Sequence, residues 1–282
     1  MSNLRSESES PQLPDASANN PLIATSAAPP LVLSLDTASE VRSVAITRGE
    51  RVLASTQGLV QKENAARVLH DIDQTLSMSG VKLGDIELFA VANGPGSFTG
   101  LRAGLATIKA FAATLNRPVV GVPTLHAIAS ACGTLPPQRV LASLPAGRGE
   151  VFAQLLSIDE ANTIQELSAP FHVNPATLLE KAANWGGDLK WAGAGAHAHV
   201  AAIIEFAKDR GIIWGAEVSE VHGLTAEKKA GWMLAPPCEA YAEEIAALGL
   251  SSYRQGSALV AGDLQALYVR LSDAELNEKC RA

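Results

Sequence analysis

One stretch constrains the fold of this chain more than any other: FAVANGPGSFTGLRAGLATIKAFAATL, residues 89–115. A short apolar run enters a glycine-rich turn, and a segment with helical spacing and hardly any polar face leaves it. A strand that passes through a tight turn into a helix is a building unit of α/β proteins. A helix that is apolar on all sides must also be covered on all sides. The stretch therefore predicts a strand, a turn and a buried helix.

The predicted helix combines a stripe of large apolar residues with small residues elsewhere. The stripe consists of Leu101, Leu105, Ile108 and Ala112, at spacings of three and four, with Lys109 beside it. One side is expected to lie on the chain's own sheet. The small residues on the other side would let a second helix approach closely. At this point two covers are open: another part of this chain, or a partner subunit.

The surrounding sequence predicts an α/β chain of two lobes. Residues 31–56 predict three strands joined by tight turns, and residues 62–80 an amphipathic helix. The apolar face of that helix holds Val68, Leu69, Ile72 and Leu76. With the stretch 89–115 and a further strand, these elements form a mixed-sheet first lobe at residues 31–137. Residues 138–282 predict a smaller second lobe, which opens with a hairpin.

Amino-acid composition and charge limit the cellular environments and the partners that suit this chain. Residues 1–30 are rich in Ser, Pro, Ala and Asn, which predicts a disordered extension. The net charge of −7 argues against a large basic surface for nucleic acid. The three cysteines lack the spacing of a disulfide framework or a zinc site, and no apolar run has the length of a membrane span. We therefore expect a cytoplasmic protein.

The glycine loop matches neither common nucleotide fingerprint. Both the Walker A and the dinucleotide pattern require Gly at the position of Thr99. A helix N-terminus can still attract an anion through free N–H groups, here around Gly94, Gly96, Ser97 and Arg102. Alternatively, the glycines serve only backbone sterics.

A second candidate anion site follows the first predicted strand. Asp36, Thr37 and Ser39 occupy the turn where actin-like and sugar-kinase-like ATPases keep a phosphate-contacting aspartate. The alternative is an Asp36 that only caps its own turn. A weak dinucleotide-like pattern in WAGAGAHAHV, residues 191–200, also reads as a plain strand-to-helix turn.

Catalytic motifs are missing from the sequence. The six histidines form neither H-x-x-x-H nor H-E-x-x-H, and there is no G-x-S-x-G or Cys–His motif. We therefore predict no catalytic residue and no metal site, which argues against a metallopeptidase or a serine hydrolase.

Three segments together resemble the bacterial TsaB (YeaZ) family. They are LVLSLDTASEVRSVAI, NGPGSFTGLRAGLATIKAFA and RPVVGVPTLHAIA, within residues 31–130. The likeness continues loosely through GEVFAQL and LYVR, and it departs at Pro145-Ala146-Gly147, where family members often read D-A-R.

The resemblance implies an actin-like/sugar-kinase (ASKHA, RNase H-like) two-lobe fold. It also implies a non-catalytic subunit of the machinery that makes N6-threonylcarbamoyladenosine at tRNA position 37. Such a subunit pairs with the catalytic paralog TsaD, is joined by the ATPase TsaE, and reaches tRNA only through the complex. The two helices at residues 62–78 and 99–115 would form the interface, and a homodimer of the isolated chain is left open beside the heterodimer. No tightly bound cofactor is expected, and binding of ATP or ADP is left open at the complex interface. The alternative is an autonomous small ASKHA-type ATP-dependent kinase that uses Asp36 as its anchor.

Overall fold

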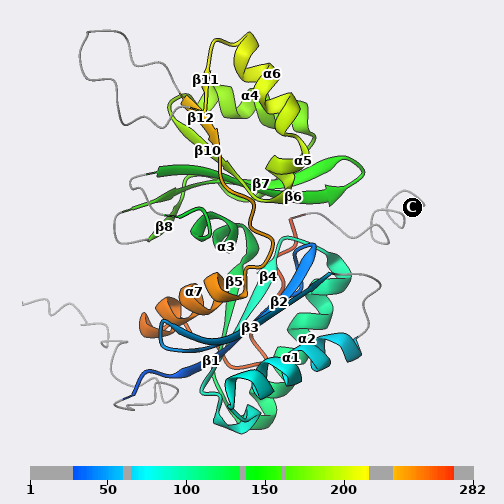
Figure 1. Cartoon of the computed structure of the whole chain (residues 1–282), viewed down its shortest axis with the longest axis vertical. Coiled ribbons are helices and arrows are strands. Elements are labelled where there is room, and N and C mark those ends of the chain that lie inside the picture. The colour runs from blue at the N-terminus through cyan, green and yellow to red at the C-terminus, as the bar shows by residue number, and fades with distance from the viewer. Residues whose placement is uncertain (1–27, 60–64, 134–137, 160–162, 216–230, 270–282) are drawn as a thin grey trace, which may run out of the picture.

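The computed structural model describes residues 28–59, 65–133, 138–159, 163–215 and 231–269. These residues form two α/β lobes, one above the other in Figure 1, each built on its own sheet. The predicted disordered extension lies outside the described residues, apart from residues 28–30.

The first sheet has the strand order β3-β2-β1-β4-β5. Its strands are β1 (Leu31–Asp36), β2 (Val41–Arg48), β3 (Arg51–Leu59), β4 (Leu88–Gly94) and β5 (Val119–Pro123). Strands β1, β2 and β3 pair antiparallel, which confirms the predicted meander. Strands β4 and β5 continue the sheet in parallel to β1.

Alternation along β1 assigns its side chains to two cores. Leu33 and Leu35 belong to the core under α1 (Ala65–Ser79) and α2 (Phe98–Leu115), whereas Val32 faces the core between the lobes. This is the two-residue period expected of a strand covered on both faces. A single 3-10 turn (Leu83–Asp85) leads from α1 into β4.

The second sheet has the order β11-β12-β10-β6-β7-β8, with β9 also pairing with β7. Its strands are β6 (Gln138–Gly147), β7 (Glu150–Ile158), β8 (Ile164–Glu166), β9 (Phe171–Val173), β10 (Leu189–Ala192), β11 (Ile213–Trp214) and β12 (Gly231–Leu234). The predicted hairpin is the β6–β7 pair. Figure 1 shows α4 (Pro175–Trp185), α5 (Ala194–Ala198) and α6 (Val200–Asp209) on the side away from the first lobe.

Two helices fill the space between the sheets, α3 (Thr124–Ser130) and α7 (Ala242–Arg254). Their buried side chains, among them Leu125, Ile128 and Ile245, join one core cluster with residues of both sheets. The two lobes thus share a continuous apolar core.

Helix α7 departs from the predicted division of the chain at residue 137. It comes from the segment assigned to the second lobe, yet it packs against the first sheet. The Ser34 hydroxyl donates to the Ala242 carbonyl (2.7 Å), and the Ala242 N–H donates to the Ser43 hydroxyl (3.1 Å). From the end of α7 to residue 269, the chain stays on the first lobe, where Leu259 pairs with Val119 at the sheet edge and Leu264 is buried. Local sequence patterns do not predict this return, because it depends on contacts between residues far apart in the chain, such as Ser34 and Ala242, which are 208 positions apart.

In the part of the chain that the structure describes, we find no helix with the length and apolarity needed to cross a membrane.

Candidate functional site

The two sequence motifs of the first lobe dock directly onto each other. The N-terminal half of α2 lies on the turn that follows β1. A Cβ atom built on Gly100 would overlap the Thr37 carbonyl oxygen, and one on Gly104 would overlap the Thr37 hydroxyl. A Cβ on Gly96 would meet the backbone of Ala38 in the same way. Of the two explanations for the glycines, their close packing therefore favours backbone sterics.

Two of the predicted phosphate contacts, Asp36 Oδ1 and the Thr37 hydroxyl, have hydrogen-bond partners within the chain. The Asp36 carboxylate is buried, and its Oδ1 accepts hydrogen bonds from the N–H groups of Ala38 (2.8 Å) and Ser39 (3.3 Å). Burial raises the pKa of this carboxyl above its ordinary value, although these hydrogen bonds work in the opposite direction. The Thr37 hydroxyl donates to the Gly100 carbonyl (2.7 Å). Asp36 thus caps its own turn, and Thr37 ties the turn to α2.

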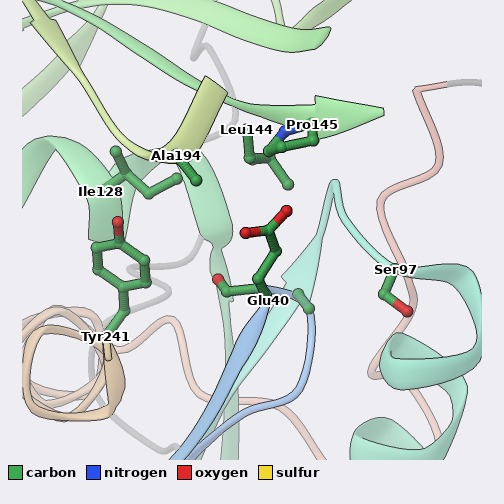
Figure 2. Close-up of a pocket in the computed structure, with 9 residues that line it drawn as sticks. Glu40, Ser97, Ile128, Leu144, Pro145, Ala194 and Tyr241 are labelled. Atoms are coloured by element: carbon green, nitrogen blue, oxygen red, sulfur yellow. The ribbon is translucent and has the colours of Figure 1, made fainter. Parts of the chain in front are cut away.

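A cavity of about 380 Å³ lies between the lobes, beside this turn (Figure 2). Glu40 from the turn extends toward its centre, Ser97 borders it from the start of α2, and Tyr241 borders it from the residue before α7. The rest of its described lining is apolar: Ala38, Ile128, Leu144, Pro145 and Ala194, with Ser39 the remaining hydroxyl.

The described lining does not suit a nucleotide phosphate. It has no Lys or Arg, and its charged group, Glu40, would repel a phosphate. Gly94 lies away from the lining, where a Cβ would overlap the Leu267 carbonyl group. Asp36, Thr37, Ser39, Gly94, Gly96, Ser97 and Arg102 are thus near one another in the fold, but they do not converge on one anion. The weak pattern at residues 191–200 is the predicted strand-to-helix turn, with Gly193 packed against the Ser143 carbonyl.

The side chains predicted to face a partner fall into two groups. The structure buries Val68, Ile72, Leu105, Ile108 and Ala112 in the core beneath α1 and α2, and it buries Leu101 in the core between the lobes. Their apolar character is therefore explained by cover from within the chain. Leu69 is 47% exposed, while Leu76 and Lys109 are half-buried. The solvent-facing side of α2 instead carries small residues that the apolar stripe did not include: Ala106, Ala110 and Ala113.

A cluster of three side chains lies at the start of α2. The Arg102 guanidinium lies 3.8 Å from the centre of the Phe98 ring, and the centre of the Tyr268 ring lies 5.5 Å from that of Phe98, with the two rings tilted by 40°. The neighbouring N–H of Leu267 donates to the Asn93 carbonyl (2.7 Å). This cluster fastens the C-terminal segment to the first lobe. No local pattern predicts it, because Arg102 and Tyr268 are 166 positions apart in the chain.

Among the described residues, no group of three or more His, Cys, Asp and Glu side chains is arranged to hold a metal ion. Within the described ranges, the pairs His126–Glu166 (3.0 Å) and His172–Glu150 (2.8 Å) lie on the second sheet and α3 rather than at the cavity. Burial lowers the pKa of His126, while Glu166 acts in the opposite direction.

Comparison with known proteins connects this geometry to a family. The family model described as "TsaD: tRNA N6-adenosine threonylcarbamoyltransferase" matches residues 45–221, more than half of the chain. The "tRNA threonylcarbamoyladenosine biosynthesis protein TsaB" of Escherichia coli is 32% identical over 165 residues, which cover 58% of this chain and 71% of that protein. The chain belongs to the TsaB (YeaZ) family. The Haemophilus influenzae TsaB is 36% identical over 123 residues, covering 43% of this chain and 51% of the relative.

The fold of the family is also the fold of this chain. The solved structure of YeaZ from Pseudomonas aeruginosa superposes with a TM-score of 0.63 at 21% identity, over 85% of this chain and 99% of that one. This confirms the predicted α/β fold class, the ASKHA two-lobe fold with mixed sheets.

Proposed function

We propose that this TsaB-family chain is a non-catalytic scaffold subunit in the formation of N6-threonylcarbamoyladenosine at tRNA position 37. Two relatives that support the family assignment are named for tRNA threonylcarbamoyladenosine biosynthesis. The structural observation that carries the proposal is the outer face of α1 and α2. This face, the docking face from here on, comprises Leu69, Arg102, Ala106, Ala110 and Ala113.

The docking face has the properties of a helix-packing surface. Ala106, Ala110 and Ala113 follow one another at spacings of four and three, so they form a smooth exposed stripe along α2. Small side chains allow the backbone of another helix to come close. Leu69 on α1 adds an exposed apolar side chain, and a buried apolar anchor is what gives an interface its affinity.

The partner in this proposal is the catalytic paralog TsaD, with the ATPase TsaE joining the pair. A homodimer of the isolated chain would use the same face, since the two subunits are paralogs. The chain would reach tRNA through the complex, in keeping with its net charge of −7. Any ATP or ADP would bind at the complex interface, because the interlobe cavity offers phosphate no positive side chain among its described lining residues.

Threonylcarbamoylation of tRNA in vitro, with TsaC-type synthase, TsaD and TsaE, tests the proposal. We expect modification only when this chain is added. The variant Ala110→Glu places a charge in the middle of the exposed stripe and is expected to weaken TsaD binding by about a hundredfold, because the interface would bury an unpaired carboxylate. The matched control is Ala202→Glu, at an exposed position of α6 on the far lobe, which should leave binding unchanged.

Buried positions of α2 are unsuitable for this test. Leu105→Glu or Ala112→Glu would place a charge in the core and unfold the chain, so lost activity would carry no information about the docking face. Modification that proceeds equally without the chain would contradict the scaffold function. Steady ATP turnover by the isolated chain would favour the autonomous kinase instead.

A further inference from the structure

Helix α1 does not bury its most apolar side. Val68, Leu69, Ile72 and Leu76 share one arc of the helix, which predicts that this arc lies on the sheet. The structure instead buries Val68, Ile72 and Thr75, and it leaves Leu69 47% exposed and Leu76 half-buried. The helix is thus rotated about its axis away from Leu69 and toward Asp71 and Thr75.

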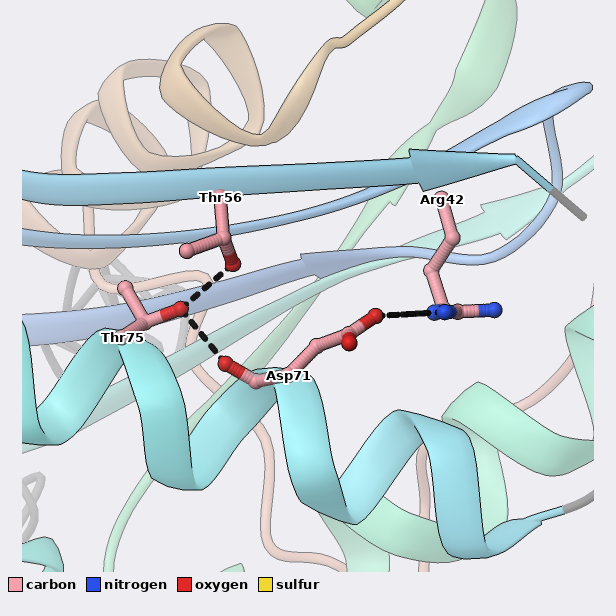
Figure 3. Close-up of polar contacts among 4 residues, drawn as sticks. All are labelled: Arg42, Thr56, Asp71 and Thr75. Atoms are coloured by element: carbon pink, nitrogen blue, oxygen red, sulfur yellow. Dashed lines mark hydrogen bonds and ion pairs between the residues drawn. The ribbon is translucent and has the colours of Figure 1, made fainter.

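An ion pair lies on the side to which α1 is rotated (Figure 3). Arg42 on β2 is 3% exposed and Asp71 on α1 is 17% exposed. The Arg42 Nε–H donates to Asp71 Oδ2 (2.6 Å), and Arg42 Nη2 lies 2.5 Å from the same oxygen. Gly58 lies opposite Arg42 on β3, and a Cβ built there would be in ordinary contact with Nη2, at 3.4 Å.

A second polar contact supports the same rotation. The Thr75 hydroxyl donates its one proton to the Asp71 carbonyl oxygen (2.6 Å). It therefore accepts from the Thr56 hydroxyl of β3, which lies 2.6 Å away. Figure 3 shows both contacts joining α1 to the sheet on one side of the helix.

We propose that Arg42 and Asp71 are positioning residues that set the rotation of α1 and thereby present Leu69 on the docking face. Rotating α1 to bury Leu69 would carry the Asp71 carboxylate away from Arg42. The Arg42 guanidinium would then be buried without a counter-charge, which is strongly unfavourable. The ion pair thus keeps an apolar side chain in solvent, where a partner subunit can cover it. This inference rests on the proposed function only for the identity of that partner.

Hydroxyl-radical footprinting of the full chain without a partner tests the rotation. The quantity to measure is the oxidation of Leu69 relative to Met78, which is 59% exposed. Met78 is nine residues from Leu69 and hence on the opposite side of the helix, so it serves as an internal reference. In Arg42→Met, where Asp71 loses its partner, we expect the Leu69-to-Met78 ratio to fall about threefold as Leu69 turns inward.

Two further variants separate positioning from a general structural role. Arg42→Met/Asp71→Leu replaces the pair by two apolar side chains, which hold the same side of α1 on the sheet. We expect it to restore the wild-type ratio. It should also restore TsaD binding, which Arg42→Met alone is expected to weaken about tenfold by withdrawing one apolar anchor. Arg42→Lys, which keeps a cation beside Asp71, should remain close to wild type.

A folded Arg42→Met variant with an unchanged ratio would overturn the proposal. If that variant is unfolded, oxidation of the buried Ile72 will reveal it, and Asp71→Asn takes its place. Asp71→Asn keeps the size of the side chain but removes the counter-charge of Arg42 and should lower the ratio about twofold; an unchanged ratio in the folded variant would again overturn the proposal. The footprinting experiment needs no partner, so it tests the rotation of α1 even if the wild-type chain fails to bind TsaD. Failure to bind TsaD would contradict only the proposed function.

Discussion

Helices α1 and α2 cover the same face of the first sheet, but different forces orient them. The N-terminal half of α2 is held by shape: Gly96, Gly100 and Gly104 let it lie directly on the backbone of the turn after β1. Helix α1 is oriented by charge, through Arg42 and Asp71. Close contact between two backbones allows only one arrangement of α2 on the turn. An amphipathic helix such as α1 can rotate about its axis, and a directional polar contact fixes that rotation. The glycine-rich motif before α2 thus has a steric role, whereas the rotation of α1 depends on a specific ion pair.

The largest expected effect tests the close backbone contact that holds α2. Gly100→Ala would push a methyl group into the Thr37 carbonyl, and neither backbone can yield easily. We expect a loss of about 3 kcal/mol in the free energy of unfolding, measured by urea denaturation. Gly84→Ala is the control, since nothing lies within 4 Å of a Cβ there, and it should change stability by less than about 0.5 kcal/mol. Equal effects of the two substitutions would show that α2 is not held by close backbone contact.

The next effect concerns the ion pair that orients α1. Asp71→Ala leaves the buried Arg42 guanidinium unpaired and should cost about 2 kcal/mol, moderated because Asp71 retains some exposure. Arg42→Met/Asp71→Leu should be within about 1 kcal/mol of wild type, since apolar replacement of a buried pair is often neutral. A double variant as unstable as Asp71→Ala would mean that the pair stabilises the fold itself and does not only orient α1.

A smaller effect is expected at the start of α2. The Ser97 hydroxyl accepts a hydrogen bond from the Gly100 N–H (3.2 Å) and so caps the helix. Ser97→Ala should lower the free energy of unfolding by about 1 kcal/mol, and Ser97→Thr should restore most of it. No loss in the alanine variant would indicate that contact with the turn alone holds this end of α2.

The smallest effect should appear as a dependence on pH. Burial raises the pKa of Asp36 in the folded chain, so the folded state holds this proton to higher pH than the unfolded state does. The stability of the wild type therefore falls, through this group, as pH rises from about 4, the ordinary Asp value, toward the raised pKa. Asp36→Asn does not titrate, so its stability relative to wild type should increase over that range. Urea denaturation at several pH values measures this difference, and a difference that is flat or decreasing would contradict the assigned burial effect.

The candidate site shows where sequence reasoning succeeded and where it could not. The turn at the glycine loop and the helix after it were within its reach, because each depends on residues close together in the chain. For Asp36, the sequence left turn capping and phosphate contact both open. Whether Leu105 and Ile108 face the chain's own core or a partner was beyond its reach, because either one could cover a helix that is apolar on nearly all sides. Tyr268 beside Phe98 was also beyond reach, because only the returning C-terminal segment brings them together.

The sequence by itself determined the order of strands and helices in the first lobe, the hairpin of the second and membership in a two-lobe fold. These features follow from local periodicity, turn residues and a distinctive motif. The tertiary structure alone decided that α7 completes the first lobe, that Gly100 lies on Thr37, and that Leu69 faces outward while Thr75 faces the sheet. Each of these features depends on a contact with a residue distant in the chain, such as the contact of Asp71 with Arg42. A local sequence pattern does not specify which of several distant residues a side chain will contact.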